Sequence, residues 1–166
     1  MSEISVNNTD WSIIAAVRDA VAGATVDGEP VFAAVTVTTS PRQAEQCQLT
    51  RSPAVVLRYL TTREDDSPED VRGCVAAMEL LIAVQADAAG VDESPRLAEV
   101  LRLKNAAVNA VEAAPPAGSA AWGDGDHYQA RVAWGAPEID ASADRPWAVC
   151  RLPLQVGFVL ANGTAH

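Results

Sequence analysis

The segment that most constrains the fold of this chain lies near its C-terminus, where apolar and polar residues alternate. Every even-numbered position there is apolar: Cys150, Leu152, Leu154, Val156, Phe158 and Leu160. Alternation with a period of two places successive side chains on opposite faces of a β-strand, and it does not produce an apolar stripe on a helix. We therefore expect a strand over Val149 to Leu160 with one face in a core. Because Pro153 has no N–H group to donate, we expect this strand at a sheet edge, or Pro153 at a bulge.

A second alternating segment, Cys74 to Ala86, can be interpreted in two ways. Its even positions are apolar, whereas its odd positions include polar residues, namely Glu79 and Gln85. Yet Ser67-Pro68-Glu69-Asp70 just before it is typical of a helix start, which would make residues 68–88 helical. We favour the strand because the alternation persists over the whole segment. Residues Arg63 to Gly73 then form an exposed, acidic hairpin arm.

Helical periodicity occurs in two other segments. The first runs from Trp11 to Ala22 and ends near Gly23, with Asn8, Thr9 or Asp10 as the N-cap. The second starts with Ser94 as N-cap and Pro95 in the first turn, and Pro115-Pro116 follows it. We expect its buried face to consist of Leu97, Val100, Leu101, Val108 and Val111.

Three more segments have the β-branched or apolar composition of strands: Val31–Thr38, Ala54–Leu60 and Tyr128–Trp134. Together these elements predict an α+β fold in the order α-β-β-β-α-β-β. We expect a mostly antiparallel sheet of about four to five strands, with two main helices packed on it. The length of 166 residues fits a single domain over 1–166, with residues 1–9 and 161–166 as flexible termini.

Apolar runs and cysteines bear on the compartment of the protein. No run approaches the length that a membrane span needs, and residues 1–10 lack the order of a signal peptide. We expect no membrane association and a protein that stays in the cytoplasm. The three cysteines, Cys47, Cys74 and Cys150, have no metal-site spacing, and we expect reduced, mostly buried thiols.

Charge argues against DNA binding as the main activity. The chain has 12 Lys and Arg against 22 Asp and Glu, a formal net charge of −10, so the whole molecule repels nucleic acid. An acidic surface of this kind usually serves solubility. The alternative is an acidic wall that faces a basic partner or a conduit for DNA.

Catalytic groups are scarce in the sequence. Apart from the terminal His166, His127 is the sole histidine, and as a general base it would need Asp124 or Asp126 beside it. Gly123 to Asp126 resembles part of a calcium loop, but it supplies two carboxylates where such a site needs six to eight oxygens. We expect no enzyme activity, no cofactor and no metal site.

Aromatic residues indicate a surface for a partner. Trp11 and Trp134 lie in expected elements, whereas Trp122 and Trp147 lie in or beside loops. Exposed tryptophans often anchor protein interfaces, and Trp122 is the best candidate, although it could instead fold back onto its own domain.

The order of elements resembles that of the tail terminator proteins of long-tailed bacteriophages and their minor-tail and tail-completion relatives. The resemblance spans nearly the whole chain and has four parts: the opening helix with Trp11-Ser12-Ile13-Ile14-Ala15-Ala16-Val17, the strand entry Ser52-Pro53-Ala54-Val55-Val56-Leu57, the break Ala86 to Ser94 before the long helix, and the closing Val156-Gly157-Phe158-Val159-Leu160.

This resemblance implies a structural virion protein of the tail or neck, assembled in the host cytoplasm. Such a subunit forms a homo-oligomeric ring, commonly a hexamer, that caps the tail tube, meets the head-side connector and lets DNA pass as cargo. We expect the interface to include the arm and one tryptophan, namely Arg63, Glu64, Asp65, Asp66, Glu69, Asp70 and Trp122. The alternatives are another tail or neck completion protein, or a small cytoplasmic protein-binding adaptor domain.

Overall fold

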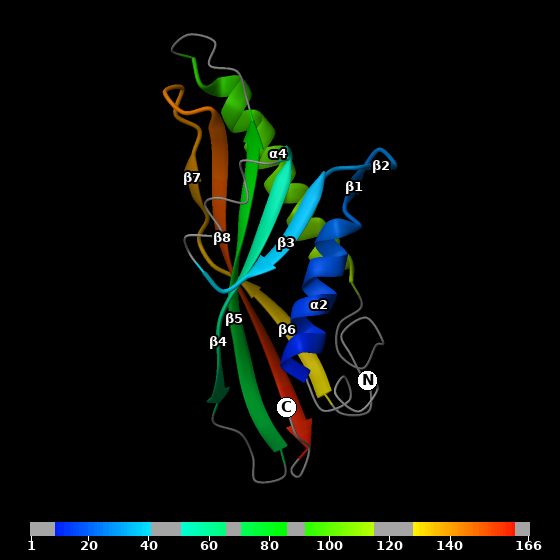
Figure 1. The fold of residues 1–166 in the computed structure, drawn as a ribbon. Coiled ribbons are helices and arrows are strands. Elements are labelled where there is room, and N and C mark those ends of the chain that lie inside the picture. The colour runs from blue at the N-terminus through cyan, green and yellow to red at the C-terminus, as the bar shows by residue number, and fades with distance from the viewer. Residues whose placement is uncertain (1–8, 41–50, 66–70, 86–91, 115–127, 162–166) are drawn as a thin grey trace.

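The computed structural model describes residues 9–40, 51–65, 71–85, 92–114 and 128–161 (Figure 1). It contains two helices and eight strands in these ranges. In chain order they are α2 (Thr9–Ala22), β1 (Thr25–Val26), β2 (Glu29–Pro30), β3 (Ala34–Thr38), β4 (Ala54–Asp65), β5 (Val71–Gln85), α4 (Ser94–Ala113), β6 (Tyr128–Trp134), β7 (Glu138–Asp140) and β8 (Trp147–Ala161).

Six strands form one strongly twisted sheet in the order β3-β4-β5-β8-β6, with β7 also paired to β8 (Figure 1). Every pairing in it is antiparallel except that between β3 and β4, which is parallel. The expected α+β class and the mostly antiparallel sheet are confirmed. The expected order lacked the short β7 and the β1–β2 hairpin, whose turn residues Asp27 and Gly28 both have positive φ angles, 53° and 82°.

Residues Val71 to Gln85 form a strand, so the helical alternative for residues 68–88 is wrong wherever the structure describes them. β5 lies between β4 and β8 and pairs with β8 along its whole length, from Val71 opposite Ala161 to Gln85 opposite Trp147. Its even side chains are at most 6% exposed: Cys74, Ala76, Met78, Leu80, Ile82 and Val84. Tertiary pairing has therefore overridden the local helix-start signal.

The expectation that the C-terminal strand lies at an edge is wrong. β8 is central, with β5 on one side and β6 followed by β7 on the other. Pro153 is accommodated because its polar backbone points to the junction between β6 and β7, where the Gly135 N–H donates to the Pro153 carbonyl at 2.9 Å. At this junction no acceptor requires an N–H group from residue 153, so proline costs the sheet no hydrogen bond.

Both helices pack on the same face of the sheet, called here the helix face (Figure 1). One apolar cluster joins α2, α4 and the sheet, and its largest fully buried side chains include Ile13, Leu57, Leu103 and Phe158. A hydrogen-bond chain adds a polar link, because the Thr62 hydroxyl contacts the Tyr59 hydroxyl at 2.6 Å and donates to Asp10 of α2 at 3.1 Å.

The buried face of α4 differs from the expected one. Leu97 is 41% exposed and Leu101 is half-buried, whereas the buried residues are Arg96, Val100, Leu103, Ala106, Ala107 and Val111. The face is rotated because Arg96 is drawn inward to hydrogen-bond the backbone at Ala141 and Arg145. The helix also starts one residue earlier than expected, since Glu93 and not Ser94 holds the N-cap position.

The ends of the described chain extend slightly further than expected. Thr9 begins α2 and Ala161 ends β8, and the remainder of the termini expected to be flexible, 1–8 and 162–166, lies outside the described residues. Cys74 and Cys150 are buried, reduced thiols, as predicted. Cys47 lies outside the described residues.

Candidate assembly interface

The sheet has a second face that looks away from both helices, and its centre is charged. It is formed by the odd-numbered residues of β5 and β8 and by their neighbours in β4, β6 and β7. Glu79 lies in the middle of β5 and is only 8% exposed. Its carboxylate accepts a hydrogen bond from Arg58 of β4 at 3.0 Å and lies 3.5 Å from the guanidinium of Arg151 of β8.

This ion triad of Arg58, Glu79 and Arg151 carries one net positive charge. The register places Arg58 directly opposite Glu79, which fixes the short contact between them. Burying a carboxylate is unfavourable unless it is paired, and two arginines meet that requirement here. Within the part of the chain that the structure describes, the Arg58 Nε atom is buried without a hydrogen-bond partner.

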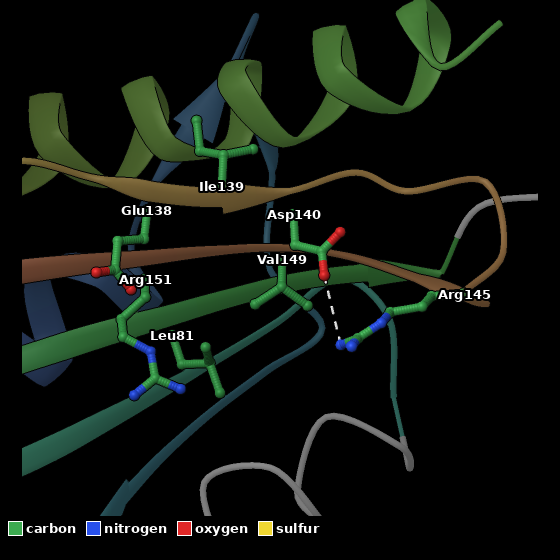
Figure 2. A pocket seen from close by; sticks show the side chains of 7 residues that line it. All are labelled: Leu81, Glu138, Ile139, Asp140, Arg145, Val149 and Arg151. Atoms are coloured by element: carbon green, nitrogen blue, oxygen red, sulfur yellow. Dashed lines mark ion pairs between the residues drawn. The ribbon is translucent and has the colours of Figure 1, made fainter.

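At the β7 end of the second face lies a hollow of about 660 Å³ (Figure 2). Ile139 points from β7 toward α4, whereas Leu81, Val149 and Arg151 point to the opposite side. Asp140 and Arg145 close one end of the hollow with an ion pair of 3.4 Å. The hollow therefore combines an apolar floor with charged walls.

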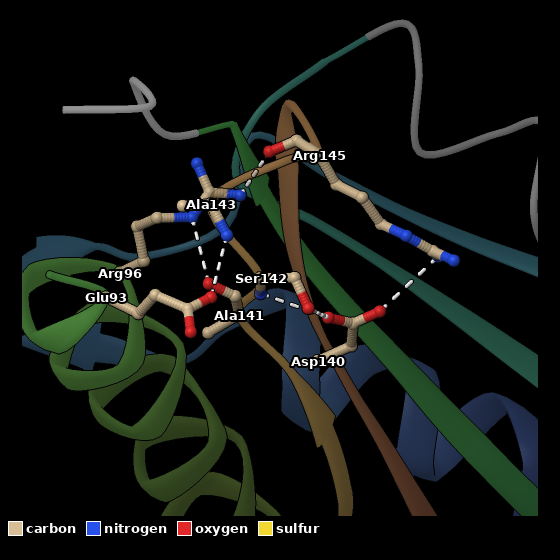
Figure 3. A network of polar contacts seen from close by, with 7 residues as sticks. All are labelled: Glu93, Arg96, Asp140, Ala141, Ser142, Ala143 and Arg145. Atoms are coloured by element: carbon tan, nitrogen blue, oxygen red, sulfur yellow. Dashed lines mark hydrogen bonds and ion pairs between the residues drawn. The ribbon is translucent and has the colours of Figure 1, made fainter. Parts of the chain in front are cut away.

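A polar network fixes the loop that borders this hollow (Figure 3). Arg96 of α4 donates to the carbonyls of Ala141 and Arg145, and Glu93 accepts from the Ala143 N–H at 2.7 Å. Hydrogen bonds from the Ser142 side chain and backbone lower the pKa of Asp140, with the charge of Arg145 adding to the effect. These contacts hold the loop in place and present no nucleophile activated by a base.

The opposite end of the sheet is the predicted arm. The structure places Arg63, Glu64 and Asp65 at the end of β4, opposite Val75, Cys74 and Gly73. Asp66, Glu69 and Asp70 lie outside the described residues. The described part of the arm is a continuation of the main sheet and not an isolated hairpin, because β8 pairs with β5 as far as Val71.

A β-bulge separates the arm from the rest of β4. The register shifts between Tyr59 and Thr61, which leaves Leu60 as the extra residue. Alternation from Arg58 puts Leu60 on the second face, where it is 45% exposed. An exposed leucine beside a bulge at the start of a projecting arm fits a contact surface.

The exposed arm-side half of the second face is called here the arm patch. Its residues are Leu60, Thr61, Arg63, Arg131, Ala133, Pro153 and Gln155, all exposed. Among the residues that the structure describes, neither Arg63 nor Arg131 is in an ion pair. The patch is therefore apolar and basic in a chain whose net charge is −10.

Three of the four tryptophans lie within the described residues, and their environments differ. Trp122, the predicted interface aromatic, lies outside the described residues. Trp147 is buried at 9% exposure, and the Trp134 indole donates to Glu112 at 3.0 Å, which ties β6 to α4. Trp11 is the exposed one, at 43%, with the Arg18 guanidinium 5.5 Å from its ring centre. Sequence reasoning passed over Trp11 because it lies within a helix.

Two observations on the described residues concern catalytic groups, namely a cysteine thiol and possible metal ligands. Burial raises the pKa of the Cys150 thiol to about 11, so this thiol is neutral and a poor nucleophile at neutral pH. The described ranges contain no group of three or more side chains able to hold a metal ion. His127, which was considered as a general base, lies outside them together with Asp124 and Asp126.

Neither described helix is long and apolar enough to cross a membrane. The chain gives no match when it is compared with protein-family models and with curated proteins. The proposed function therefore rests on the fold and on its exposed surfaces.

Proposed function

We propose that this chain is a structural subunit of a bacteriophage tail, a tail terminator. In this role it forms a homo-oligomeric ring at the head-proximal end of the tail tube and joins the tube to the neck or connector. It works by assembly and catalyses no reaction. Its place is the virion, after assembly in the host cytoplasm.

The observation that carries the proposal is the low charge of the two edge strands, β3 and β6, in the described sheet. β3 and β6 are the outermost strands, and no strand among the described residues pairs with the outer side of either. β3 has the uncharged sequence Ala-Val-Thr-Val-Thr, and β6 has a single charge, Arg131. Natural proteins usually protect such edges with charges, prolines or bulges, or cover them with a partner. A neighbouring subunit would provide that cover.

The length of the central strands also favours assembly. β5 and β8 each have 15 residues, which corresponds to about 50 Å of extended chain, whereas strands of five to six residues are usual. The helices cover one face, and the arm continues beyond α2 (Figure 1). Strands of this length project a rigid surface toward a neighbour, as a ring subunit requires.

The charge of the chain is consistent with a conduit for DNA. With a net charge of −10, a closed ring would expose acidic groups that do not retain the phosphate backbone. DNA would pass as cargo, while the tail-tube protein and the connector would be the lasting partners.

Light scattering of the purified chain over a range of concentrations, with negative-stain imaging, tests this proposal. We expect a ring of fixed size, or a monomer that closes into rings when purified tail-tube protein is added. If the chain stays monomeric at every concentration and binds neither the tube protein nor the connector protein, the proposal is contradicted and an adaptor domain is favoured.

A further inference from the structure

Three large hydrophobic side chains are exposed among the described residues: Trp11, Leu60 and Leu97. Leu97 lies on α4. Trp11 and Leu60 instead lie in patches of opposite charge, on opposite faces of the sheet. This arrangement suggests which surfaces of neighbouring subunits meet.

The first surface is the arm patch together with the adjoining ion triad. It holds four arginines, Arg58, Arg63, Arg131 and Arg151. Against them stand the carboxylate of Glu79 and, at the border of the surface, that of Glu138, which lies opposite Arg151, so the net charge is positive. Its exposed apolar part comes from Leu60, Ala133 and Pro153. A Cβ at Gly157 of β8 would meet nothing within 4 Å, which shows that this part of the surface is open.

The second surface, called here the α2 patch, consists of exposed and half-buried residues of α2 and of the β1–β2 hairpin that follows it in the chain. Its residues are Trp11, Ala15, Arg18, Asp19, Ala22, Asp27 and Glu29. The patch contains three acidic residues and one arginine. The guanidinium of this arginine, Arg18, lies over the Trp11 ring and forms an ion pair with Asp19 at 2.9 Å. The patch is therefore acidic, with Trp11 as a large exposed aromatic of the kind that anchors interfaces.

We propose that the arm patch of one copy binds the α2 patch of the next copy, head to tail. The inference rests on the proposed ring function and identifies its subunit contact. A second copy fits because each patch supplies the charge and apolar groups that the other lacks. Since the two patches lie on opposite faces of the sheet, the contact is heterologous, which generates a ring when the rotation closes.

Charge reversal of each surface tests this contact. The arm variant is Arg63→Glu with Arg131→Glu, and the α2 variant is Asp19→Arg with Glu29→Arg. The matched control, Arg51→Glu with Lys104→Glu, makes the same charge change as the arm variant at two sites outside both patches. Each protein is followed by light scattering at fixed ionic strength, and circular dichroism with a denaturant titration shows that it is folded.

We expect each two-site variant to need at least about 100-fold more protein for half-assembly, because like charges then face one another. The variant that combines all four changes restores opposite charges and should assemble within about tenfold of wild type. The control should assemble as wild type does. If a charge-reversed arm fails to fold, Arg63→Gln with Arg131→Gln replaces it, with an expected loss of about tenfold.

Two results would overturn the contact. The arm variant assembles as well as wild type, or the combined variant is folded but stays monomeric. In each case, if the wild-type chain still forms a ring, the contact is wrong but the proposed function is not contradicted. A wild-type chain that forms no ring, alone or with tube protein, instead removes the proposed function itself.

Discussion

The two faces of the sheet have different chemistry. On the helix face, the even residues of β5 from Cys74 to Val84 are all apolar and nearly inaccessible to solvent. On the second face of the same strand, Glu79 is held between Arg58 and Arg151, and the arm side adds the exposed Arg63 and Arg131. A small separate apolar cluster of Val56, Leu81 and Val149 completes this face.

We assign the two faces different roles: the helix face stabilises the fold, and the second face serves assembly. The helix face supplies most of the buried apolar area that stabilises the fold. The second face carries charges that a fold does not need, because a buried ion triad is rarely more stabilising than apolar residues of the same volume. In the proposed ring, these charges would face a neighbouring subunit.

The largest expected effect is on the helix face. Leu80→Ala removes a fully buried side chain from the centre of β5 and should lower the free energy of unfolding by about 2–5 kcal/mol. The matched change on the second face, Leu60→Ala, should alter it by less than about 0.5 kcal/mol. Urea titrations measure both. Equal losses at the two sites would contradict the division between the faces.

The second-largest expected change in the free energy of unfolding concerns the ion triad. Glu79→Gln keeps the side-chain volume but leaves Arg58 without its anion, and should lower the free energy of unfolding by about 1–3 kcal/mol. The triple change Arg58→Met, Glu79→Leu and Arg151→Met should recover most of that loss. Urea titration at two salt concentrations provides the measurement, and a Glu79→Gln protein as stable as wild type would show that the triad is dispensable.

A pair of glycines tests the packing at the strand junction. A Cβ at Gly135 would lie 2.8 Å from the Pro153 Cβ, so Gly135→Ala should destabilise the protein by about 1–3 kcal/mol. Gly157→Ala should stabilise it by about 0.5 kcal/mol, because a strand disfavours glycine and the site is open. Thermal unfolding of both variants gives the comparison. Losses of the same size at both positions would count against this account of β8.

The smallest effect concerns pH. Hydrogen bonds from Ser142 lower the pKa of Asp140 below its ordinary value, so this group adds stability above its unfolded-state pKa and loses it as the pH falls through the folded pKa. Ser142→Ala should raise the pKa of Asp140 and reduce stability at neutral pH, and this difference from wild type should disappear as the pH falls below the folded pKa of Asp140. An NMR titration of the Asp140 carboxyl in both proteins measures it, and identical curves would contradict the assignment.

Periodicity in the sequence predicted the strands and helices well, because each pattern follows from the face that the element buries. The alternation in Cys74 to Ala86 correctly outweighed the helix start at Ser67, and both helices lie near their expected positions. The central place of β8 could not be predicted in this way. The rule for Pro153 is local, whereas the junction of β6 and β7 that accommodates it is formed by distant residues.

The candidate interface was only partly accessible from sequence. The acidic run suggested the arm, and Arg63, Glu64 and Asp65 do lie at its described end. The triad was missed because a lone Glu79 in an apolar strand reveals its partners only once the register is known. Trp11 was set aside for a similar reason, since helical periodicity alone did not show that the core stripe of α2 leaves it outside.

The central claim is that the exposed surfaces of α2 and of the arm meet in the assembled protein, and hydroxyl-radical footprinting tests it most directly. Trp11, Leu60 and Leu97 are similarly exposed in the single chain, at 43%, 45% and 41%, so each starts as a reactive site. On assembly we expect Trp11 and Leu60 to become protected together while Leu97 stays reactive. Trp11 and Leu60 remaining as reactive in the ring as in the monomer would contradict the account.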